Sequence, residues 1–162
     1  CGEWKRAPRL KVWVGGEARV AGGVARAVVE GTLIGCGAAV VKGGLWTTPG
    51  VEVAVTTRKA DGVIIITASH NPRQWNALKL LNADGEFLSD AEGKRVLALA
   101  EEEGFEFPDI DRIGKVLSRS SFNEEHIRRV LALPLVDVVA VRKRGSKVVV
   151  EPVHSFGCLV IA

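Results

Sequence analysis

Methionine is absent from all 162 residues of the chain, including the first position. Because translation starts with methionine, we expect the chain to be a processed product or a piece of a longer protein. Long apolar runs are absent as well, since no stretch approaches the roughly 18 apolar residues that span a bilayer. The first six residues, CGEWKR, lack the apolar core of a secretory signal peptide. The sequence therefore predicts neither a membrane span nor a signal peptide.

Cysteine is scarce and irregularly placed. The three cysteines, Cys1, Cys36 and Cys158, are odd in number and lack the close spacing of a zinc site. A chain of this length rarely depends on a disulfide framework, so a reduced, cytoplasmic setting is predicted. Concentrated positive charge is missing too: the net charge is +3, and only residues 142–144 (R-K-R) form a basic run. This pattern argues against nucleic-acid binding.

Hydrophobic residues make up 47% of the chain, enough to bury one sizeable core, so one domain is expected. Alternating and helical apolar spacings predict an α/β layered domain with glycine-marked helix ends. The expected strands cover residues 10–14, 38–41, 62–66 and 77–81, and the expected helices cover 20–34, about 90–103 and a segment beginning near Ser121. Residues 82–85 (N-A-D-G) predict a tight, hairpin-type turn.

Two segments leave alternatives open. Residues 51–55 are either a strand or the first turns of a helix that follows Pro49. Residues 137–144 form either a short helix ending at Gly145, which we favour, or a strand that pairs with residues 147–150. Capping-box spacing supports the helices that begin after Ser89 and after Ser121.

The most informative stretch is a buried strand that ends in polar residues. Residues 63–66 are four β-branched residues in a row, typical of a strand buried on both faces. The run stops at Thr67, and Asn71 with Pro72 then forces a turn. A hydroxyl, an imidazole and an amide (Ser69, His70 and Asn71) follow the strand together. Because ligands of open α/β sheets bind at carboxyl strand ends, this loop is the candidate site.

This loop resembles the phosphoserine loop of the α-D-phosphohexomutases, which include phosphoglucomutases, phosphomannomutases and phosphoglucosamine mutases. The resemblance lies in T-A-S-H-N-P at residues 67–72, followed by Asn76 and Lys79. The version at residues 75–82 is most similar to a bacterial branch often labelled phosphoglucosamine mutase. Residues 11–19 and 43–49 also resemble family loops, and 147–153 resembles the strand that opens the second family domain. The resemblance covers residues 10–161.

The resemblance implies a mixed, mostly parallel sheet with flanking helices, incomplete at both ends. It places residues 1–145 in the first family domain, without its amino-terminal segment, and residues 146–162 at a truncated second domain. The implied reaction interconverts hexose or hexosamine 1-phosphate and 6-phosphate through phospho-Ser69 and a hexose 1,6-bisphosphate, which serves as intermediate and activator. The implied metal is Mg²⁺, bound through the Ser69 phosphate and by three aspartates outside this chain. The expected partners are the sugar phosphate and the remaining domains of the parent chain; the alternative is a domain fragment without turnover.

Each candidate residue also has a plainer interpretation. Ser69 could simply satisfy a turn, and His70 could fix the loop by a hydrogen bond instead of lying beside the phosphate. Asn71, a candidate phosphate contact, is expected mainly to hold the turn. The resemblance implies that Lys79 assists proton transfer at the sugar hydroxyl, with charge support for phosphate as the milder role. Arg19, a candidate phosphate ligand, is equally compatible with a solvated surface role.

Two further observations qualify this interpretation. Glu17 stands where the family usually has aspartate, so the local hydrogen bonds of that loop are in question. The pair Ser69 and His70 also invites a serine-hydrolase interpretation. Neighbouring residues of an extended segment point to opposite faces, which would place His70 badly as a base, and no G-x-S-x-G motif is present.

Overall fold

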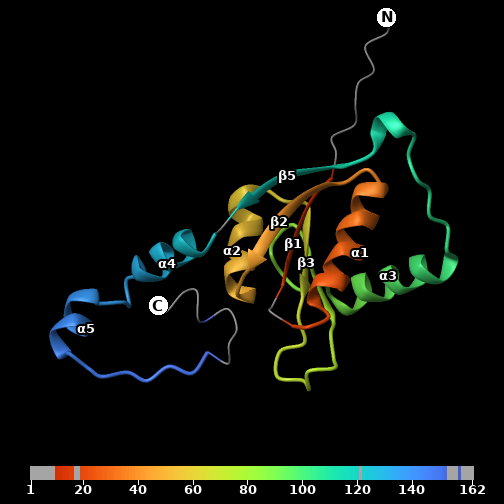
Figure 1. Ribbon diagram of the computed structural model, residues 1–162. Coiled ribbons are helices and arrows are strands. Elements are labelled where there is room, and N and C mark those ends of the chain that lie inside the picture. Colours follow the sequence, from red (N-terminus) through yellow and green to blue (C-terminus); the bar gives the residue numbers. More distant parts are fainter. Residues whose placement is uncertain (1–9, 17–18, 121, 153–156, 158–162) are drawn as a thin grey trace, which may run out of the picture.

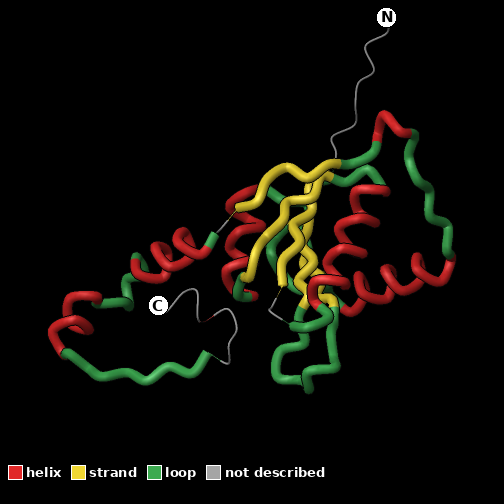
Figure 2. Tube along the Cα trace, in the orientation of Figure 1, coloured by secondary structure: helices red, strands yellow, loops and turns green. Residues whose placement is uncertain are grey.

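A computed structural model describes residues 10–16, 19–120, 122–152 and 157. A five-stranded sheet forms its centre, in the order β4-β3-β1-β2-β5 (Figures 1 and 2). The strands are β1 (Lys11–Gly16), β2 (Ala39–Leu45), β3 (Gly62–Ile66), β4 (Leu78–Leu81) and β5 (Lys115–Ser120). All neighbours are parallel except β3 and β4, which are antiparallel. The predicted mixed, mostly parallel sheet is confirmed.

Helices cover both faces of the sheet. Helix α1 (Gly22–Gly35) lies on one face, where Val29 and Leu33 pack against Val14 and Val40 of the strands. Helix α2 (Thr48–Arg58) lies on the opposite face (Figure 1). The cluster under α2 is the larger one and includes the ring pair Trp13 and Trp46, whose centroids are 4.9 Å apart. The sheet is therefore buried on both sides, as the β-branched run of β3 predicts.

Helix α2 decides one open alternative. It begins at Thr48, because the Thr47 hydroxyl accepts a hydrogen bond from the Gly50 N–H at 3.1 Å and Pro49 suits the first turn of a helix. Residues 51–55 are thus helical and not a strand. Strand β2 also runs further than expected, through Gly43 to Leu45, so the loop before α2 is only two residues long.

An ion pair joins α1 to β2. Glu30 is 5% exposed, and its Oε2 atom lies 2.5 Å from the Lys42 Nζ atom of β2. One helical turn before Glu30 in α1, the Arg26 guanidinium donates to the Gly43 carbonyl of β2 at 3.3 Å. The Lys42 side chain is half-buried and Glu30 is buried, so removal of Lys42 would leave a buried carboxylate without its partner.

The turn after β4 and the helix after it match the sequence patterns. In residues 82–85 the Gly85 N–H donates to the Asn82 carbonyl, and Gly85 has a φ of 80°, as a tight turn requires. Helix α3 (Asp90–Glu102) begins with a complete capping box between Ser89 and Glu92. Both predictions are confirmed.

In the C-terminal part, the helix before Gly145 is confirmed, whereas the start of the helix before it and the last expected strand differ from the prediction. Helix α5 (Val138–Arg144) ends at Gly145, as favoured. Helix α4 (Asn123–Leu131) is capped by Phe122, which makes no side-chain cap bond; Ser121 lies outside the described residues. The strand that the resemblance implies at residues 147–153 is not found in the described part, residues 147–152. Val149 is 98% exposed, and within the described chain no neighbouring strand completes a ladder for this segment.

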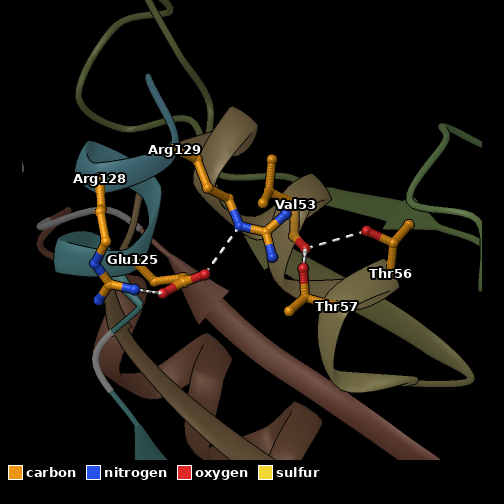
Figure 3. A network of polar contacts seen from close by, with 6 residues as sticks. All are labelled: Val53, Thr56, Thr57, Glu125, Arg128 and Arg129. Carbon is orange, nitrogen blue, oxygen red and sulfur yellow. Dashed lines mark hydrogen bonds and ion pairs between the residues drawn. The ribbon is translucent and has the colours of Figure 1, made fainter. Parts of the chain in front are cut away.

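Helix α4 packs against α2. Phe122 is 1% exposed and joins the core under α2, with the Arg58 guanidinium carbon 5.7 Å from its ring centre. Figure 3 shows the polar contacts along the two helices. Glu125 pairs with both Arg128 and Arg129 on α4, and on α2 the hydroxyls of two threonines donate to the Val53 carbonyl.

Two short elements were not identified in the sequence, namely β5 and a single helical turn at Ile110–Arg112. Among the described strands, β5 lies at the edge of the sheet and pairs only with β2. An edge strand can lack a continuous apolar run, so residues 115–120 gave no strong pattern. In the part of the chain that the structure describes, no helix is long and apolar enough to cross a membrane.

The contact between Gly16 and Ile66 generates a prediction about stability. A Cβ atom on Gly16 would lie 2.6 Å from the Ile66 carbonyl oxygen, so Gly16→Ala should lower the free energy of unfolding by about 1–3 kcal/mol. Gly31→Ala is the matched control, because a Cβ atom there meets nothing within 4 Å inside α1. That variant should gain about 0.5–1 kcal/mol. Urea denaturation measures both, and equal effects of the two variants would contradict the close contact.

The capping box of α3 generates a second prediction. Hydrogen bonds from the Ser89 hydroxyl and the Ser89 N–H lower the pKa of Glu92 below its usual value. Because the pKa of Glu92 is lower in the folded state, the carboxylate stabilises α3 fully at pH values above the usual glutamate pKa. This stabilisation is lost as the pH falls through the folded-state pKa of Glu92. An NMR titration of the Glu92 carboxyl should therefore show a low midpoint that rises in Ser89→Ala. An unchanged midpoint in that variant would show that Ser89 does not stabilise the carboxylate.

Candidate active site

The candidate site lies at the point of the sheet where successive strands change side. From β1 the chain passes through α1 to β2 on one side of β1, and the next strand, β3, lies on the other side of β1. The last residues of β1 and β3, Gly16 and Ile66, are register partners, so the loops that follow both strands emerge side by side. In Figure 2 the long loop after β3 extends from this end of the sheet. Open α/β sheets bind ligands at such a switch point.

Ser69 adopts an unusual backbone conformation in this loop. Its φ is 50°, in the left-handed region that L-residues other than asparagine and aspartate seldom enter. The preceding Thr67 is 1% exposed, and its hydroxyl accepts the Ser69 N–H at 3.1 Å. Ser69 itself is exposed. A buried side chain thus holds the backbone while the serine hydroxyl faces outward, and such outliers are typical of functional loops.

His70 lies beside the serine hydroxyl, which the sequence argument did not expect. An extended segment would direct the two side chains to opposite faces, but the left-handed Ser69 makes the segment non-extended, so that expectation is wrong. The Ser69 Oγ and His70 Nδ1 atoms are 3.5 Å apart, at the outer limit of a hydrogen bond. His70 is exposed, and among the described residues no third group bonds its other ring nitrogen. A hydrolytic triad needs such a group to orient the imidazole.

The two asparagines of the loop hold its turns. The Asn71 side chain donates to the Ala68 carbonyl at 2.9 Å, and the Asn71 N–H donates to the same carbonyl at 3.0 Å. The Asn76 side-chain oxygen accepts the N–H of Ala77 at 3.0 Å. The expectation that Asn71 holds the turn is confirmed, while contact between Asn71 and a phosphate stays a prediction.

Arg19 reaches the loop from the segment after β1. Its Nη1 atom donates to the carbonyls of Pro72 and Trp75 at 2.9 and 3.1 Å. Its Nη2 atom donates to the carbonyls of Ser69 and Asn71 at 2.6 and 2.9 Å. Arg19 is therefore half-buried against the loop and not a solvated surface residue. Glu17, two positions earlier, lies outside the described residues.

Lys79 lies on β4, opposite Ile65 of β3. Its Nζ atom is 5.9 Å from the centre of the Phe87 ring, close enough for a cation–π contact. Among the described residues, no hydrogen bond or ion pair joins Lys79 to Ser69. The side chain is half-buried on the strand next to β3, and its role in proton transfer stays a prediction.

Comparison with known proteins identifies the family. Residues 2–107 match the family model described as phosphoglucomutase/phosphomannomutase, alpha/beta/alpha domain I. The chain belongs to this family. The match covers the sheet through β4 together with α1, α2 and α3, and it includes the whole candidate site. It ends before residue 145, so the domain boundary expected there stays a prediction.

Relatives and solved structures agree with this assignment. A phosphoglucosamine/phosphogalactosamine mutase of Sulfurisphaera tokodaii is 30% identical over 150 residues, which are 92% of this chain and 32% of the relative. A phosphoglucosamine mutase of Xanthomonas euvesicatoria is 35% identical over 112 residues, 69% of this chain and 25% of the relative. A phosphoglucomutase/phosphomannomutase family protein of Burkholderia thailandensis shares the fold, with a TM-score of 0.64 at 21% identity over 75% of this chain and 27% of that chain. The chain spans about a third or less of these proteins.

The phosphohexomutase resemblance implies a metal, and the donor set of this site bears on it. The loop offers a hydroxyl, an imidazole and amides, which are weak partners for Mg²⁺ compared with carboxylates. Among the described residues, no three histidine, cysteine or acidic side chains form a group that could hold a metal ion. The described residues therefore do not form a magnesium site by themselves.

One functional residue escaped the sequence analysis. Thr67 ends the buried run and opens the motif at residues 67–72, but neither pattern assigns a role to its hydroxyl, which accepts the Ser69 N–H. The available signal was a threonine two positions before the serine, a spacing that suits a local side-chain turn. Its burial at 1% exposure could not be read from that spacing.

The left-handed Ser69 predicts an order of stability among site variants of this family member. Alanine at position 69 keeps the cost of a positive φ, whereas glycine adopts this conformation freely. Ser69→Gly should therefore be more stable to urea than Ser69→Ala, by up to about 1 kcal/mol. Both variants lack the hydroxyl, so the comparison isolates the backbone. If Ser69→Ala proved the more stable variant, the loop would not hold this conformation in solution.

Proposed function

We propose that the protein carrying this chain is a phosphohexomutase, in which Ser69 holds the phosphoryl group between its two transfers. The observation that carries the proposal is the exposed Ser69 at the switch point of the sheet, in a left-handed backbone that Thr67 and Arg19 hold. Family membership supports it. A fixed, exposed hydroxyl suits phosphoryl transfer, because this chemistry depends chiefly on positioning and on neutralisation of charge.

The proposed reaction consists of two transfers. In the first, the bond between Ser69 Oγ and phosphorus breaks, its electron pair stays on Oγ, and a sugar hydroxyl oxygen bonds to phosphorus. The hydroxyl proton passes to Ser69 Oγ, and Lys79 is the candidate group that assists this proton transfer. The hexose 1,6-bisphosphate then reorients and its other phosphate returns to Ser69 Oγ, so the phosphoserine is restored. A serine ester thereby divides one difficult transfer into two easier ones.

Substrate, metal and location belong to the same proposal. Two relatives are named for hexosamine phosphates, so glucosamine 1-phosphate and 6-phosphate are the first substrates to test. Mg²⁺ would require ligands outside the described residues, in addition to the Ser69 phosphate. We place the protein in the cytoplasm, with the further family domains as its partners. The competing proposal is that the chain as given is a domain without turnover, because it spans about a third of its relatives.

Ser69→Ala in the full-length encoded protein tests the mechanism. Loss of the phosphoryl carrier should lower kcat/KM for glucosamine phosphate interconversion by at least about a thousandfold. Ser146→Ala, at an exposed position after α5, should leave the rate unchanged. Substantial residual mutase activity in Ser69→Ala would refute the phosphoserine mechanism.

Two assays on the chain as given separate the competing proposals. Mutase turnover by residues 1–162 alone would contradict the need for ligands outside this chain, whereas absence of turnover agrees with the incomplete domain. Labelling of Ser69 by a fluorophosphonate would favour a serine hydrolase. We expect no labelling, because among the described residues nothing orients His70 as a base.

A further inference from the structure

The Arg19 guanidinium is the most connected side chain of the site. Its two terminal nitrogens donate to four backbone carbonyls within residues 69–75, at distances of 2.6 to 3.1 Å. The two terminal nitrogens carry four hydrogens, the same number as the carbonyls that they contact. These nitrogens can bind a phosphate only by giving up part of the loop.

The same contact fixes the unusual conformation of Ser69. The Ser69 carbonyl accepts from Arg19 Nη2 at 2.6 Å, and the Ser69 N–H donates to the Thr67 hydroxyl at 3.1 Å. Both backbone groups of Ser69 are thus bonded to side chains, one local and one 50 residues earlier in the chain. A residue other than glycine keeps a left-handed backbone conformation only where surrounding contacts stabilise it, and these two hydrogen bonds are such contacts.

We propose that Arg19 is a positioning residue, which holds the Ser69 loop in its transfer-competent conformation through four carbonyls and does not bind the substrate. This inference rests on the proposed function. The guanidinium also keeps a fixed positive charge within the loop, where a phosphoryl group on Ser69 would add about two negative charges. Arg19 therefore supports the loop by geometry and the phosphorylated state by charge.

Three variants separate geometry from charge. Arg19→Lys keeps the charge, but a single nitrogen with three hydrogens cannot serve four carbonyls. Arg19→Met removes both contributions and keeps a side chain of moderate length. Arg73→Met is the matched control, since Arg73 is an exposed arginine of the same loop and no hydrogen bond or ion pair involves it among the described residues.

Hydrogen exchange on the chain as given measures the loop directly. Exchange of the amides in residues 67–77 should speed up at least about tenfold in Arg19→Met and about threefold in Arg19→Lys, while Arg73→Met matches the wild type. Amides of β1 and β2 serve as the internal reference. If Arg19→Met failed to fold, the amide exchange of Arg19→Lys compared with that of Arg73→Met would test the inference alone. Loop exchange in the Arg19 variants equal to that of Arg73→Met would overturn the inference.

A second readout links the loop to the chemistry and separates the two proposals. The full-length protein is incubated with radiolabelled glucose 1,6-bisphosphate, and phosphate on Ser69 is counted. Arg19→Lys should lower kcat and the rate of phosphate incorporation at least tenfold with little change in KM. In a further variant, Arg19→Ala, added guanidinium at millimolar concentration should restore part of the lost rate. A raised KM with unchanged kcat would instead show substrate binding by Arg19. Absence of phosphate on wild-type Ser69 would refute the proposed function, while altered loop exchange in the Arg19 variants would still support the anchoring of the loop.

Discussion

The site depends on the close contact between two parallel strand ends. Gly16 ends β1 directly beside Ile66 at the end of β3, at a distance that leaves no room for a Cβ atom on Gly16. Strand β1 is packed on both faces, against α2 on one side and α1 on the other. Because the two strands end together, the segment with Arg19 and the loop with Ser69 begin side by side.

From this starting point the loop is held on two sides. Thr67 binds it from the core beneath, and Arg19 binds its carbonyls from the neighbouring loop. Both contacts involve backbone groups, so the hydroxyl of Ser69 and the imidazole of His70 stay on the surface. Side chains that are presented on a fixed backbone lose little freedom when a substrate binds, and this is the arrangement that transfer reactions need.

Local patterns in the sequence predicted the parts of the fold that local chemistry controls. The β-branched run of residues 63–66 gave the buried strand β3, and the Ser89 and Glu92 pair gave the start of α3. The motif at residues 67–72 indicated the family and the loop that carries Ser69. Residues 147–150 have high β propensity but form no strand, because the described chain offers them no strand to pair with.

By itself, then, the sequence determined which segments form the buried strands, where the polar loop follows them and which family the loop belongs to. These features depend on residues close together in the chain. Only the tertiary structure decided that Ser69 takes a left-handed conformation with His70 beside it, and that Arg19 bonds the loop 50 residues away. The physical reason is that such contacts depend on the pairing of β1 with β3, which brings distant segments together and which no local spacing encodes.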